Sequence, residues 1–187
     1  MDQENSLMRL TQDEFAEAYT ECYPRMWVIA ASAVCDRSKA DDILQEAAVV
    51  GLRKISQFKR GTRFDAWIAS IVRFVASNSR RKAANRKTYA VESRHLDSLP
   101  GNNSGESAAQ DVAFHAAGNL TDTAFDDQVL SALRDLNETA RACLLLRTIH
   151  NLSFQEISEL LEIPQGTAMS HVHRSKSLLR ERLQSHA

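Results

Sequence analysis

The 187-residue sequence contains few of the features that mark secreted or membrane proteins. Its three cysteines, Cys22, Cys35 and Cys143, are odd in number and widely spaced, so they do not indicate a disulfide framework. No apolar run approaches the length that spans a bilayer, and the N-terminus is acidic and polar rather than signal-like. We therefore expect a soluble, cytoplasmic protein.

Catalytic and metal-binding patterns are also scarce. The chain has only 6 glycines and no glycine-rich loop that could cradle a phosphate. His171 and His173 are two residues apart, which directs them to different sides of a helix and makes a poor zinc site. Cys143 falls within an apolar helix face and is expected in the core. The sequence predicts a protein that is not an enzyme and that uses no cofactor and no metal.

The net charge of −1 gives no sign of a polyanionic partner, but it conceals segments of opposite sign. Residues 1–94 carry a net charge of +4, residues 95–128 carry −6 and residues 129–187 carry +1. Within the first segment, residues 53–87 hold 11 basic residues and one acidic residue. Such a run favours contact with phosphates, and a solvated helix face is the alternative interpretation.

Composition divides the chain into two helical domains and a linker. Residues 95–127 are acidic, contain a Pro-Gly-Asn-Asn-Ser-Gly stretch and have few large apolar side chains, so they are interpreted as a flexible linker. Residues 1–94 form the predicted N-terminal domain, and residues 128–187 form the C-terminal one. Strand-like alternation is absent, and we predict an all-α fold.

Helical periodicity predicts three helices in the N-terminal domain, over residues 13–34, 41–58 and 64–82. Pro24 is expected to break or bend the first of them. Apolar side chains recur at helical spacing along the third helix and form one inward face. That face comprises Phe64, Trp67, Ile68, Ile71, Val72 and Val75.

Aromatic rings are interleaved with the basic residues of the third helix. Rings of this kind can stack on unpaired bases in proteins that bind single strands. Trp67 lies on the apolar face, so a place in the core is favoured for it, whereas Phe74 lies off that face. The helix is therefore a candidate surface for melted nucleic acid.

The C-terminal domain has the pattern of a helix-turn-helix. Helices are predicted over 128–136, 138–149, 154–161 and 165–183, and Ser153 and Glu156 have the spacing of a capping box. A tight turn separates the last two helices, and short polar and basic side chains are exposed near the start of the last one. Such a helix suits the major groove of DNA, and an ordinary surface helix hairpin is the alternative interpretation.

Together the two halves resemble a known family, the sigma factors of bacterial RNA polymerase, and specifically the small extracytoplasmic-function (ECF) group. The first block of the resemblance comprises residues 40–46, Leu52, Phe58, and residues 64–68, 71–73 and 80–82. The second block comprises residues 133–136, Arg141, and residues 145–147, 152–157, 166–170, 174–176 and 179–180.

The resemblance implies a non-catalytic subunit that binds core RNA polymerase and directs promoter-specific transcription initiation. Core docking on the clamp helices of the largest polymerase subunit is implied for Asp41, Asp42, Gln45 and Glu46. Capture of the melted minus-ten element, on its non-template strand, is implied for Lys59, Arg60, Arg63, Trp67, Arg73, Phe74, Asn78, Arg80, Arg81 and Lys82. Contact with the duplex minus-thirty-five element is implied for Thr167, Met169, Ser170, His171, His173, Arg174 and Lys176.

The resemblance also implies an anti-sigma factor as a partner and no insertion into the membrane. A stand-alone helix-turn-helix regulator that binds duplex DNA as a dimer is the alternative function. Such a regulator would need neither the docking block nor a surface for single strands.

Overall fold

The computed structural model of the chain describes residues 10–94 and 132–184, apart from the side chains of Arg37 and of residues 85–94. The regular elements of these residues are all helical, in agreement with the predicted fold class. They are α2 (Gln12–Val34), α3 (Arg37–Arg53), the 3-10 helix η1 (Ile55–Gln57), α4 (Phe64–Arg94), α6 (Glu138–Thr148), α7 (Phe154–Leu161) and α8 (Gln165–Gln184). The predicted linker, residues 95–127, lies outside the described residues.

Helices α2, α3 and α4 pack against one another and form the N-terminal domain. A capping box between Thr11 and Glu14 starts α2. The helix then continues through Pro24 to Val34, which excludes a break, one of the two effects predicted for this proline. Gly51 lets α3 pack tightly, because a Cβ atom there would lie 3.0 Å from both Ile68 and Phe15 side-chain atoms.

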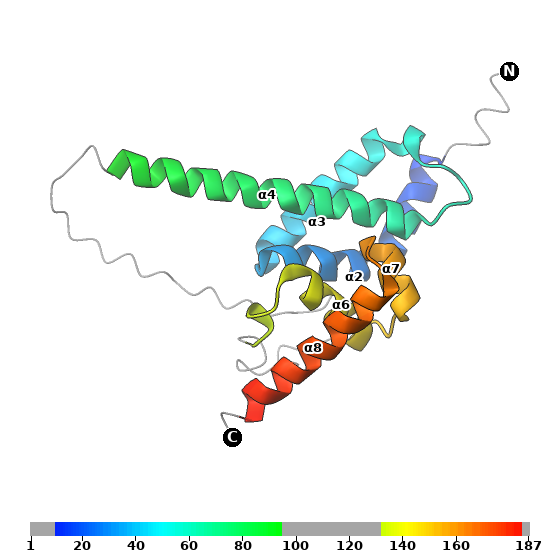
Figure 1. Cartoon of the computed structure of the whole chain (residues 1–187). Helices are drawn as coiled ribbons and strands as arrows, with labels where there is room; N and C mark the ends of the chain where they lie inside the picture. Colours follow the sequence, from blue (N-terminus) through cyan, green and yellow to red (C-terminus); the bar gives the residue numbers. More distant parts are fainter. Residues whose placement is uncertain (1–9, 95–131, 185–187) are drawn as a thin grey trace, which may run out of the picture.

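Helix α4 begins where the sequence predicts and ends twelve residues later, at Arg94 rather than position 82. No proline and no glycine interrupts the segment 83–94, so nothing in it stops a helix. Ile68, Ile71, Val72 and Val75 of the predicted apolar face are buried. Figure 1 shows α4 extending beyond the other helices.

Helices α6, α7 and α8 form the C-terminal domain, and the predicted capping box between Ser153 and Glu156 is present at the start of α7. Glu162 ends α7 in the left-handed conformation, with φ of 54°. Helix α8 then begins at Gln165, so the helix-turn-helix has the predicted spacing. Of the helix predicted over 128–136, residues 132–134 are helical and residues 128–131 lie outside the described residues.

The two domains are docked on each other. Helix α6 packs on α2, and helix α7 packs on α4 (Figure 1). One cluster of buried side chains runs through both domains. Arg141 of α6, only 5% exposed, is at the centre of this contact. Its guanidinium donates across the boundary to Ser32 O, at 2.7 Å, and within its own domain to Leu133 O and Leu136 O.

The Arg141 guanidinium also contacts the Sγ atom of Cys35. Ser32 O and Cys35 are at the C-terminal end of α2, where carbonyl groups have no partner within the helix and the helix dipole favours a cation. A buried arginine without a carboxylate is therefore satisfied by main-chain acceptors from both domains.

Candidate polymerase and nucleic-acid interfaces

The exposed face of α3 combines acidic and apolar side chains. Asp42, Gln45 and Glu46 are exposed, and Val49 and Leu52, 48% and 40% exposed, follow at helical spacing on the same element. Large apolar side chains that are open to solvent beside charged ones are typical of a protein-binding surface. Helical spacing from Leu44 and Ala48 predicts Leu52 on the inward apolar face of this helix, and its exposure in the structure corrects that prediction.

Asp41, the fourth predicted docking residue, is half-buried. Its Oδ1 atom accepts a hydrogen bond from Nε1 of Trp27 at 2.8 Å, which fastens α3 to the buried part of α2. The hydroxyl of Tyr19 similarly donates to Leu44 O at 2.7 Å. These two bonds fix the orientation of the exposed α3 face relative to the rest of the N-terminal domain.

The loop between η1 and α4 carries the first basic residues of the predicted minus-ten surface. Lys59, Arg60 and Arg63 are all exposed around a turn at Gly61, whose φ of 85° suits glycine. Arg60 pairs with Glu14 at the start of α2, with 2.7 Å between Nη2 and Oε1. The loop is thus tied to the helix bundle while its cations stay at the surface.

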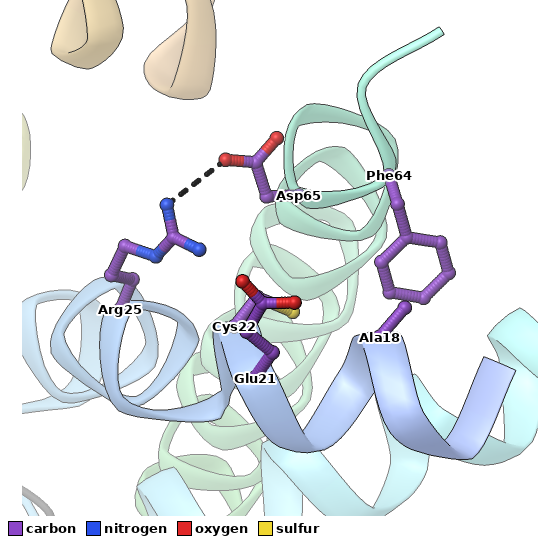
Figure 2. A pocket seen from close by; sticks show the side chains of 6 residues that line it. All are labelled: Ala18, Glu21, Cys22, Arg25, Phe64 and Asp65. Carbon is purple, nitrogen blue, oxygen red and sulfur yellow. Dashed lines mark hydrogen bonds and ion pairs between the residues drawn. The ribbon is translucent and has the colours of Figure 1, made fainter. Parts of the chain in front are cut away.

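Asp65, in the first turn of α4, holds two arginines, Arg63 and Arg25, and Figure 2 shows its bond to Arg25. Arg63 donates to it through Nε and Nη2, at 3.1 and 2.7 Å, and Arg25 of α2 donates through Nη1 at 3.2 Å. Burial opposes ionisation of Asp65, but the bonds from Arg63 and the charge of Arg25 outweigh it and lower the pKa of this carboxyl below its ordinary value. Asp65 therefore stays ionised and orients Arg63.

A cavity of about 220 Å³ lies beside Asp65, lined by Ala18, Glu21, Cys22 and Arg25 of α2 and by Phe64 and Asp65 of α4 (Figure 2). Burial raises the pKa of the Cys22 thiol to about 12, and it does the same for Cys143 in the C-terminal core. Both thiols are therefore protonated at neutral pH and unsuited to nucleophilic chemistry. Cys143 is fully buried, as the sequence predicts.

The two aromatic rings singled out on α4 have different surroundings. Trp67 is half-buried and packs against Phe15, Phe58 and Phe64, with ring centroids 5.2 to 6.5 Å apart. The packing favours the core interpretation of Trp67. Phe74 is 58% exposed, which leaves its ring available for stacking.

The remaining predicted minus-ten residues follow along α4. Arg80, Arg81 and Lys82 are exposed, Arg73 and Asn78 are half-buried, and Arg81 donates to the Oδ1 atom of Asn78. The structure therefore brings all the basic residues of this set to the loop and to the surface of one helix. Three of its arginines have glutamate partners in the C-terminal domain.

The N-terminal half of α8 presents the predicted minus-thirty-five residues. Met169, Ser170, His173, Arg174 and Lys176 are exposed, while Thr167 and His171 are half-buried. Ala168 and Val172 are buried, on the side of α8 that packs against α6 and α7. Polar and basic groups thus lie on the outer side of a helix that is anchored by its inner side.

Two family matches follow the two domains. Residues 18–86 match the family described as Sigma-70 region 2, and residues 126–179 match Sigma-70, region 4. The RNA polymerase sigma factor CarQ of Myxococcus xanthus is 30% identical over 172 residues, which cover 92% of this chain and 90% of the relative. The chain belongs to the ECF-type RNA polymerase sigma factors.

Other similar proteins agree with this assignment. The ECF RNA polymerase sigma factor SigW of Bacillus subtilis is 25% identical, over 92% of this chain and 90% of its own. Among solved structures, the sigma factor RpoE in complex with the anti-sigma factor NepR from Bartonella quintana has a TM-score of 0.59 and 19% identity, over 91% of this chain and 97% of that one. CnrH in complex with the cytosolic domain of CnrY has a TM-score of 0.60 and 16% identity, over 95% and 92%.

This ECF sigma factor is a non-enzymatic subunit that directs transcription initiation, and the family as a whole binds core RNA polymerase and promoters. The stand-alone regulator is the weaker alternative, because a region 2 match covers the N-terminal domain. Within the described ranges 10–94 and 132–184, no helix is long and apolar enough to cross a membrane, and no three His, Cys, Asp or Glu side chains gather as metal ligands.

Sequence reasoning missed three residues that organise these surfaces. Asp65 orients Arg63, Glu14 holds Arg60, and Arg141 joins the domains. Asp65 was visible as the single acid among the basic residues of 53–87, which is the signal that could have identified it. No local signal marks the other two, since their partners are distant in the sequence.

Proposed function

We propose that this sigma factor docks on core polymerase through the exposed face of α3. Asp42, Gln45 and Glu46 make the polar contacts, Val49 and Leu52 the apolar ones, and Asp41 positions the helix through its bond to Trp27. The observation that supports this surface is the coincidence of exposed acids with exposed apolar side chains on a helix that is firmly attached to the domain. The exposed α3 face carries acidic side chains, whereas the two proposed DNA-binding surfaces carry basic ones.

The proposed minus-ten surface is the loop of residues 59–63 together with the basic side of α4. Its arginines and lysines attract the phosphates of the non-template strand, and Phe74 stacks on an unpaired base. Trp67 contributes by supporting the aromatic cluster beneath the loop. The proposed minus-thirty-five surface is the outer side of α8, where Arg174 and Lys176 contact phosphates and shorter side chains reach base edges.

An anti-sigma factor is the proposed regulatory partner. The support comes from solved structures of similar fold, in which RpoE is bound to the anti-sigma factor NepR and CnrH is bound to the cytosolic domain of CnrY. We place the protein in the cytoplasm, where bacterial RNA polymerase works. Co-purification of the tagged sigma factor from its own organism would identify the partner, and recovery of core polymerase without any inhibitory protein under all growth conditions would contradict this part of the proposal.

Run-off transcription with purified core polymerase tests the proposed function as a whole. Genomic fragments that yield a transcript only when the full-length protein is added would define its promoters. The matched test uses Arg73→Ala, which removes one minus-ten cation from α4, and Arg134→Ala, which removes an exposed cation on the other domain. We expect the first variant to reduce open-complex formation and the second to leave it unchanged. Equal activity of both would contradict the minus-ten surface.

A further inference from the structure

Met169 is a large apolar side chain that α8 leaves open to solvent. It is 49% exposed. The other exposed large apolar side chains of the described residues, Val49, Leu52 and Phe74, already have a place on the proposed docking and minus-ten surfaces. One exposed apolar residue does not by itself indicate a binding site, so the role of Met169 depends on what surrounds it.

Two cations flank the outer side of α8. Arg174 and Lys176 are both exposed, and at 3.6 residues per turn they lie about 160° apart around the helix axis. Gly166 and Ser170, also exposed, lie between them in this projection. The arrangement suits a helix that enters a groove of duplex DNA, because phosphates border the groove on both sides and short side chains let the helix approach the bases.

Gly166 gives independent support for a close approach. It lies in the first turn of α8, and a Cβ atom placed on it would meet no other atom within 4 Å. Glycine is a poor helix former relative to alanine, and no contact among the described residues excludes a side chain at this position. The missing side chain is therefore not explained by packing within the protein, and it leaves room for a molecule that lies against the start of α8.

Met169 lies one turn beyond Gly166, on the side of α8 that carries Lys176. It follows the buried Ala168 and precedes Ser170, which lies opposite the buried side of the helix. A side chain in this lateral position reaches the floor of a groove only if it is long. Methionine meets this requirement, because it is unbranched and adapts its shape to its surroundings.

The chemistry of the side chain selects the base. Methionine has no strong hydrogen-bonding group, so it does not match the donors and acceptors that most base edges present. Thymine alone displays an apolar group in the major groove, its 5-methyl group. We propose that Met169 is a specificity-determining residue that packs on the 5-methyl group of a thymine in the minus-thirty-five element. This inference rests on the proposed minus-thirty-five surface.

Replacement of thymine by uracil tests the contact, because it removes the methyl group and leaves base pairing and the O4 acceptor unchanged. The binding partner is the holoenzyme, formed from core polymerase and the full-length protein. The probe is a duplex promoter fragment found by run-off transcription, in which each thymine of the upstream element is replaced singly, on either strand. We expect uracil at one position to weaken binding about fourfold, the effect of one methyl group returned to water.

Three variants assign the effect to Met169. Met169→Gln keeps the length of the side chain but makes its end polar, so it should bind the thymine and uracil fragments equally. Met169→Leu stays apolar and should still prefer thymine. Leucine and glutamine form helices about as well as methionine does, so α8 should remain intact, and unchanged affinity for core polymerase checks this. Lys176→Ala removes a phosphate contact and should weaken binding of both fragments by the same factor.

The outcomes separate this inference from the surface on which it rests. An upstream element without a thymine that is sensitive to uracil would overturn the role of Met169, and so would a sensitivity that persists in Met169→Gln. In either case, weaker binding by Lys176→Ala would still support the minus-thirty-five surface. Full affinity of both Arg174→Ala and Lys176→Ala would contradict that surface, and the thymine contact would fail with it.

Discussion

Arg141 shows how much a single side chain contributes to this sigma factor. A guanidinium presents five donors in a fixed plane, and here they bind carbonyl oxygens of Ser32, Leu133 and Leu136 among others. These acceptors come from the end of α2 and from the turn before α6. No other side chain has the length and the number of donors to satisfy all three, so this position tolerates neither lysine nor an apolar residue.

Arg141→Met is expected to lower the free energy of unfolding by at least about 2 kcal/mol, because it leaves buried carbonyl groups without donors. Urea denaturation of the full-length protein measures the change. Arg134→Met is the matched control, since the Arg134 side chain is exposed and only its carbonyl oxygen bonds to Arg141. Equal stability of the two variants would show that solvent replaces the guanidinium and that the interface does not depend on it.

The contacts that Arg141, Glu138, Glu159 and Glu162 make across the domain boundary could not be predicted from the sequence. Ser32 is 109 residues from Arg141, and nothing near either residue indicates the other. Ile68 and Cys143, in contrast, lie on apolar faces with helical spacing, and their burial follows from that spacing. Sequence patterns thus predict which side of a helix faces inward, but they do not predict which element covers the remaining side.

At the scale of the helices, local signals determined how accurately each boundary was predicted. The Ser153 capping box and Pro164 are both within one turn of the helix ends that they define, and α7 and the start of α8 lie at the predicted residues. Helix α3 starts at Arg37 rather than at the predicted residue 41. Asp36 caps it, but no Glu follows at the position that would complete a capping box, so the sequence signal for this start is weaker. Leu52 shows the same limit, since one apolar residue can belong to a docking face rather than to the core.

The α3 face gives a prediction about core polymerase. Asp42→Lys/Glu46→Lys should lower the affinity for core at least about fivefold at low salt, and the difference should shrink as salt is added, because the contact is at the surface. Fluorescence anisotropy of the labelled sigma factor with core polymerase measures it. Glu17→Lys/Glu21→Lys reverses two exposed charges on α2 and should bind normally. A loss that is independent of salt would indicate unfolding of α3 rather than altered charge.

Helix α8 gives a prediction about promoter DNA. Arg174 is exposed near the N-terminal half of α8, and Arg180 is exposed further along it. In the holoenzyme, Arg174→Ala should weaken binding to an upstream duplex element by about 1–3 kcal/mol and leave the affinity for core intact. Arg180→Ala should have a smaller effect, since the N-terminal part of a recognition helix contacts the bases. Electrophoretic mobility shift assays, on a promoter found by run-off transcription, compare the DNA affinities of the two variants.

At the scale of the whole molecule, the net charge of −1 is the sum of opposite charges, some of which lie close together in the structure. The basic residues of α4 and the acidic residues of the C-terminal domain are opposite each other in the docked arrangement. Charges that compensate one another within the chain reduce its long-range attraction for DNA. The near-neutral total therefore includes arginines and glutamates that are paired across the interface between the domains.

His150 is expected to make this interface sensitive to pH. Burial lowers the pKa of His150 in the docked form, the charge of Arg25 acts in the same direction, and a hydrogen bond to the Pro24 backbone opposes both. When the domains separate, His150 regains an ordinary pKa of about 6.5, so the open form binds more protons. The docked form is therefore fully stable above that pH and weakens as the pH falls below it.

Small-angle X-ray scattering at about pH 8 and about pH 5.5 should show an increase in the radius of gyration at the lower pH. His150→Gln keeps a polar side chain that cannot become charged, and it should abolish the increase. His173→Gln, on the exposed side of α8, should retain it. An increase that persists in His150→Gln would assign the pH response to another group, and the half-buried histidine would then have only a packing role between the end of α6 and α2.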